Sequence, residues 1–179
     1  MRDRLAFALS AASFLFLLEA LRALFGVLFA GFYAALFPEF QPAALLLALF
    51  PLAGLLLASL PFVRWLERDR VVAYSIITAA VLRIGLCLPA LQPRTIFSAT
   101  VLACCAVFTV VATGSFSRRI HAGGAATGIV LDQVLRLFGR SYDLTMRPQW
   151  LPAQAAIAAI VIAMALAFTA RADTESGAD

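Results

Sequence analysis

The chain has 179 residues, of which 63% are hydrophobic, and its mean hydropathy is +0.95. Soluble globular domains do not reach these values, so we predict an all-α polytopic membrane protein with the lipid bilayer as its main partner. All 14 basic residues are arginines, and the net charge of +4 is accounted for by membrane topology, so no nucleic-acid partner is expected.

The apolar segments predict a bundle of six transmembrane helices. The first four are expected at residues 10–37, 42–63, 71–89 and 95–116, and the last two at 122–138 and 151–170. Lengths near 20 residues match a hydrocarbon core of about 30 Å, since a helix rises about 1.5 Å per residue. Residues 1–170 are therefore expected to form one transmembrane domain, and the polar residues 171–179 a disordered cytoplasmic tail.

The arginines predict the orientation of these helices. If the N-terminus is inside, the inner segments hold eight arginines and the outer ones three. The inner set is Arg2, Arg4, Arg64, Arg68, Arg70, Arg118, Arg119 and Arg171, and the outer set is Arg94, Arg140 and Arg147. The positive-inside rule then places both termini on the cytoplasmic side of the plasma (inner) membrane.

The helix expected at 122–138 differs from the others. Gly124, Gly128, Asp132 and Arg136 recur every four residues and form one ridge on a helix. The two glycines allow another helix to approach closely, which predicts a packing face. Because the segment is short and charged, a re-entrant or interfacial position is an alternative, but the arginine count favours a full crossing.

Five charged residues inside the apolar segments are candidate substrate-binding residues: Glu19, Arg22, Arg83, Asp132 and Arg136. Charges at membrane depth face a bundle interior, a partner or a water-filled path. The surplus of one arginine suits an anionic group, either on a solute or on a lipid. The alternative is structural, because Glu19 with Arg22 and Asp132 with Arg136 can each pair within one helix.

Other polar positions give weaker signals. Ser98, Cys105, Thr109 and Thr113 form a mild stripe in the segment 95–116. The segments 42–63 and 151–170 show no comparable face, so they are expected to be lipid-facing or peripheral.

Enzyme chemistry is not indicated. His121 follows two arginines in a predicted cytoplasmic turn, where we expect it to be solvated, and Ser115 with His121 lacks a buried nucleophile or an oxyanion site. The three cysteines lie in apolar segments and are expected to act as small hydrophobic residues. No metal-ligand spacing or cofactor motif is present, so we expect no enzyme, metal or cofactor.

Six spans with both ends inside and an arginine-rich loop at 64–70 resemble one six-helix half of a major facilitator-type transporter. The resemblance implies two three-helix repeats, with substrate held between two such halves. The family's loop signature has a glycine and then an acidic residue ahead of a basic run. In this chain Gly54 lies far upstream, and Arg64 or its apolar neighbours take the place of the acidic residue. The gating role of that motif therefore does not carry over, and no repeat is detectable between 10–90 and 95–170.

Two segments, Leu17–Tyr33 and Thr127–Pro148, are similar to the membrane region of bacterial facilitator-like proteins, some of which are fused to an endonuclease/exonuclease/phosphatase-type domain. The resemblance implies a transporter-like module that moves or binds a small solute, either as a homodimer or with a second half. The alternative is a non-transporting subunit or anchor that docks another protein, including a substrate-binding subunit of a modular importer.

Overall fold

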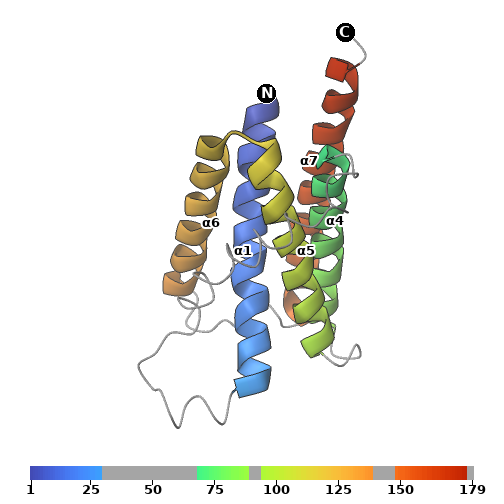
Figure 1. Cartoon of the computed structure of the whole chain (residues 1–179). Coiled ribbons are helices and arrows are strands. Elements are labelled where there is room, and N and C mark those ends of the chain that lie inside the picture. The colour runs from blue at the N-terminus through green and yellow to red at the C-terminus, as the bar shows by residue number, and fades with distance from the viewer. Residues whose placement is uncertain (30–67, 89–93, 139–147, 177–179) are drawn as a thin grey trace.

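The computed structural model describes residues 1–29, 68–88, 94–138 and 148–176 of the chain. Within these ranges it is all-helical, as the composition predicted (Figure 1). For residues 22–29, 94–96, 136–138 and 172–176 only the backbone is described. The helices are α1 (Arg2–Phe29), α4 (Arg68–Leu86), α5 (Arg94–Ser115), α6 (Arg118–Phe138) and α7 (Leu151–Ser176), and the short 3₁₀ helix η3 (Pro148–Trp150) precedes α7.

The five described helices lie side by side, with α1, α4 and α6 running in one direction and α5 and α7 in the other (Figure 1). Helix α1 packs against α6 on one side and against α5 and α7 on another, while α4 packs mainly against α5 and α7. As a result, α1 begins and α7 ends at the same end of the bundle. We call this the basic end, because the arginines of the first turns of α1, α4 and α6 lie there.

Two helices begin at least four residues earlier than the hydropathy pattern predicted. Helix α1 starts at Arg2 rather than at residue 10, because the residues between contain no helix breaker and Asp3 in the first turn interacts favourably with the helix dipole. Helix α6 starts at Arg118 rather than at residue 122, because Ser117 caps it: the backbone N–H of Ile120 donates to Ser117 Oγ at 3.2 Å. The predicted end of the first span, at 30–37, lies outside the described residues.

The core of the bundle is apolar and includes large aromatic side chains. Phe16 of α1, Phe108 of α5 and Phe168 of α7 are all fully buried. Phe116, after the end of α5, packs edge-on against Phe168 at a ring-centroid distance of 5.2 Å. This contact joins the residues that follow α5 to α7 near the basic end.

Three of the described helices are long and apolar enough to cross a membrane: Arg2–Leu21 in α1, Phe97–Ser115 in α5 and Pro148–Arg171, which contains η3 and most of α7. The outer surface of α7 exposes large apolar side chains, among them Ile160 at 59% and Leu166 at 54%. Such a surface is typical of contact with lipid, in agreement with the expected membrane localisation. Helices α4 and α6 are more polar and are not among the three, and the predicted span 42–63 lies outside the described residues.

Candidate functional site

Each of the five described helices contributes one buried polar side chain to a common level of the bundle. We call this set the polar layer, and its members are Glu19 (3% exposed), Arg83 (6%), Ser98 (0%), Asp132 (0%) and Gln154 (4%). Three of them, Glu19, Arg83 and Asp132, were predicted as substrate-binding residues from the sequence.

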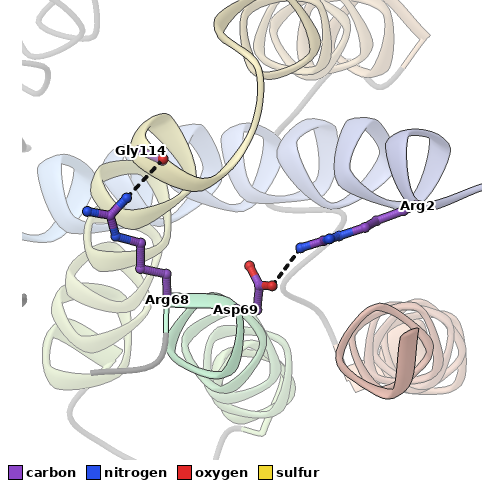
Figure 2. Close-up of polar contacts among 4 residues, drawn as sticks. All are labelled: Arg2, Arg68, Asp69 and Gly114. Carbon is purple, nitrogen blue, oxygen red and sulfur yellow. Dashed lines mark hydrogen bonds and ion pairs between the residues drawn. The ribbon is translucent and has the colours of Figure 1, made fainter. Parts of the chain in front are cut away.

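Contacts at the basic end set the register of α1, α4 and α7. Arg2 of α1 forms an ion pair with Asp69 of α4, with Nη2 and Oδ2 2.6 Å apart (Figure 2). Arg171 of α7 contacts Met1, with Nη2 2.8 Å from Sδ. The polar-layer residues on these three helices lie 14–17 positions from those contacts. They therefore sit about 21–26 Å from the basic end, at about 1.5 Å per residue.

Helices α5 and α6 reach the same level. The guanidinium of Arg68 donates to the backbone carbonyl of Gly114 at 3.3 Å, so the end of α5 lies beside the start of α4 (Figure 2). Ser98 is 16 positions before Gly114, which corresponds to about 24 Å. In α6, Gly128 packs against Ala11 and Phe14, so Asp132, one turn further on, lies within about one turn of the level of Glu19.

The centre of the polar layer is an ion pair between Glu19 of α1 and Arg83 of α4. Its side chains are only 3% and 8% exposed, and the Arg83 Cζ lies 4.5 Å from the centroid of the Phe16 ring, a cation–π contact. Among the described residues, Arg83 Nη1 and Ser98 Oγ have no hydrogen-bond partner. Arg83 thus finds on another helix the acidic partner that α4 does not supply, and it keeps donor capacity in a buried space.

The predicted pairs within single helices involve Arg22 and Arg136, whose side chains lie outside the described residues. What is described is that Glu19 pairs across helices with Arg83 and that Asp132 is completely buried. Asp132 Oδ2 accepts a hydrogen bond of 3.2 Å from Gln133 Nε2.

The two glycines of α6 lie directly against α1. A Cβ atom at Gly124 would be 2.5 Å from the Ser10 Cβ, and one at Gly128 would be 2.5 Å from the carbonyl oxygen of Ala11. Real Cβ atoms do not approach other atoms so closely, so each position accepts only glycine at this helix separation. The ridge that contains Asp132 is therefore the contact face of α6 with α1.

His121 is not solvated, contrary to the expectation from its two arginine neighbours. The side chain is 8% exposed, its Nδ1 lies 3.0 Å from Ser10 Oγ in a hydrogen bond, and its ring packs against Phe14 and Phe116. The early start of α6 explains the difference, because it places His121 in the first turn of a helix that packs on α1. Its hydroxyl partner is Ser10, not Ser115.

Burial of His121 predicts a pH-dependent stability. Desolvation lowers the pKa of His121 below its usual value near 6.5. Because the unfolded chain then binds more protons, the free energy of unfolding is unaffected above about pH 6.5 and decreases as the pH falls below it, by at most about 1.4 kcal/mol per pH unit. Melting temperatures in detergent from pH 8 to 5 are expected to show this decrease. The variant His121→Asn, which keeps a polar group near the position of Nδ1, is expected to show a smaller decrease in melting temperature. An equal decrease in both proteins would contradict the attribution of the pH dependence to His121.

Gln154 was missed from the sequence, which predicted that 151–170 would be lipid-facing or peripheral. Helix α7 does expose much of its surface, but it also packs against α4 and α1 and buries Gln154. The signal was present: Gln154 is a single amide near the start of a long apolar run, and such a residue at membrane depth usually faces other helices.

No protein-family model, curated protein or solved structure matches this chain. Within the described residues, no group of three or more His, Cys, Asp or Glu side chains is placed to hold a metal ion. The function is therefore argued from the polar layer and from the arrangement of the helices.

Proposed function

We propose that the protein is an integral membrane transport module in which the polar layer binds a small anionic solute, working as a homodimer or with a second half. The observation that carries the proposal is the Glu19–Arg83 ion pair in the interior of the bundle. A buried ion pair adds little stability compared with packed apolar residues, so its presence fits a binding role. The planar guanidinium of Arg83 suits carboxylate or phosphate groups.

The proposal includes six membrane crossings with both termini cytoplasmic, the topology of a facilitator half. Two features support it. Helix α1 begins at the basic end, and α7 ends there. Helix α1 ends at the opposite end of the bundle, whereas α4 begins at the basic end, as a further crossing within 30–67 would require. The arginines of the basic end then lie inside, in accordance with the positive-inside rule.

Cysteine labelling tests this orientation. Ser117, at the start of α6, and Gln149, in η3 at the opposite end, are both exposed. In a background with Cys87, Cys104 and Cys105 replaced by Ala, Ser117→Cys is expected to react with an impermeant thiol reagent only from the cytoplasmic side. Gln149→Cys is expected to react only from the outside, and labelling of both from one side would refute the topology.

A solute-binding assay tests the function. Purified protein in liposomes is presented with radiolabelled small carboxylates and phosphate esters. The double variant Glu19→Gln with Arg83→Met removes both charges and is expected to fold but to lose uptake or binding. Arg70→Gln, at an exposed arginine of the basic end, is the control and is expected to retain it. The transport proposal fails if no solute binds the wild type, or if the double variant binds as well as the wild type.

A second candidate is a non-transporting subunit that docks another membrane protein. It is favoured by the environment of the ion pair, because Glu19 and Arg83 neutralise each other and the Phe16 ring covers the guanidinium. In that case the double variant retains full function, and a protein partner copurifies in a fixed ratio. The two candidate functions therefore predict different activities for the double variant Glu19→Gln with Arg83→Met.

A further inference from the structure

The basic end of the bundle carries a strong excess of positive charge. Among the described residues, seven arginines from four helices lie there: Arg2, Arg4, Arg68, Arg70, Arg118, Arg119 and Arg171. Four carboxylates share this end: Asp3, Asp69 and, on the last turns of α7, Asp173 and Glu175.

Two of the arginines are used to join helix ends. Arg2 pairs with Asp69, and its guanidinium also lies 5.5 Å from the centroid of the Phe168 ring. Arg68 donates to the carbonyl of Gly114 (Figure 2). These contacts hold the first turns of α1 and α4 beside the last turns of α5 and α7. They also occupy the carboxylate of Asp69.

Three other arginines have no such role. Arg4, Arg118 and Arg119 are exposed, and among the described residues their side chains form no ion pair or hydrogen bond. They belong to the first turns of α1 and α6, which meet where Phe7 packs against Gly123 and Gly124. The three arginines therefore belong to the same part of the basic end, where the first turns of α1 and α6 meet.

Arg118 and Arg119 are also unfavourably placed for α6 itself. The N-terminal turn of a helix carries the positive end of its dipole, so two cations there destabilise the helix unless an anion is present. Further along α6, four large apolar side chains are exposed: Val130, Leu131, Val134 and Leu135. Positive charge followed along one helix by exposed apolar side chains matches a phospholipid, which has a phosphate group above an acyl chain.

We propose that the α1–α6 edge of the basic end binds the headgroup of an anionic phospholipid through Arg4, Arg118 and Arg119. An acyl chain of the same lipid then lies along the exposed surface of α6. This site is separate from the polar layer and does not depend on solute transport, because the two lie about 20 Å apart along the helices.

The test compares phosphatidylglycerol with phosphatidylcholine. Wild type, the double variant Arg118→Gln/Arg119→Gln and the control Arg94→Gln, at the opposite end, are prepared in nanodiscs of each lipid. Phosphatidylglycerol is expected to raise the melting temperature of the wild type and the control by several degrees. The double variant is expected to lose at least about half of this shift, while in phosphatidylcholine it melts at or above the wild-type temperature because the dipole conflict is relieved.

Three outcomes overturn the proposal. They are an equal phosphatidylglycerol shift in the double variant, no difference between the two lipids for the wild type, and reproduction of the full shift by millimolar inorganic phosphate, which would assign the arginines to a soluble anion. If the double variant melts lower than the wild type in phosphatidylcholine, the proposal is tested instead by the amount of phosphatidylglycerol that each protein retains in native mass spectra. Equal retention by wild type and variant overturns the proposal, and reduced retention by the variant supports it.

Discussion

Either single change, Glu19→Gln or Arg83→Met, is expected to lower the free energy of unfolding by about 3–5 kcal/mol. Each leaves one ionised side chain buried without its partner, since the two carry 3% and 8% exposure in the bundle. The double variant removes both charges and is expected to recover most of the lost stability. Melting in detergent and unfolding in SDS measure the effect. A double variant no more stable than the worse single one would show that the two side chains do not act as a pair.

The same three variants separate a structural pair from a binding site. If Glu19 and Arg83 only stabilise the bundle, the double variant regains both stability and activity. If they bind solute, stability returns but binding does not, because neutral side chains cannot replace the guanidinium contact. We expect the second result, since Arg83 Nη1 has no hydrogen-bond partner among the described residues and Ser98 Oγ, of the same layer, has none either.

Gly128→Leu is expected to cost about 1–3 kcal/mol or more through overpacking. The added Cβ would lie 2.5 Å from the carbonyl oxygen of Ala11 and 2.9 Å from the Phe14 Cβ. The first of these is backbone, so the conflict is relieved only if α6 moves away from α1. Ala126→Leu, at an exposed position of the same helix, is the matched control and is expected to leave the melting temperature almost unchanged. Equal melting of the wild type and Gly128→Leu would mean that the close packing of α6 on α1 is wrong.

Much of the secondary structure follows from the sequence. Long apolar runs of strong helix formers, separated by prolines and arginines, predict helices wherever the structure describes them, and the high hydropathy predicts a membrane protein. The four-residue spacing of Gly124, Gly128 and Asp132 predicts that these residues share a face, because the geometry of one helix is local. Spacing does not indicate which helix that face contacts.

The partners of the polar side chains were decided by the tertiary structure. Spacing allows Glu19 to pair with Arg22, whose side chain lies outside the described residues, but it gives no sign of the described partner, Arg83 on α4. From its neighbours His121 is solvated, yet the packing of α6 on α1 buries it beside Ser10. Neither outcome can be read from periodicity, because each depends on how two helices distant in sequence align.

The polar layer shows the same limit across the whole bundle. The sequence marks Glu19, Arg83 and Asp132 as polar residues in apolar surroundings, and Gln154 carries a similar signal. Their common depth is set by contacts at the other end of the bundle, such as Arg2 with Asp69, which fix the axial position of each helix. Which side chains are polar is a property of the sequence, whereas their meeting at one level arises from the register between helices, and only tertiary packing determines that register.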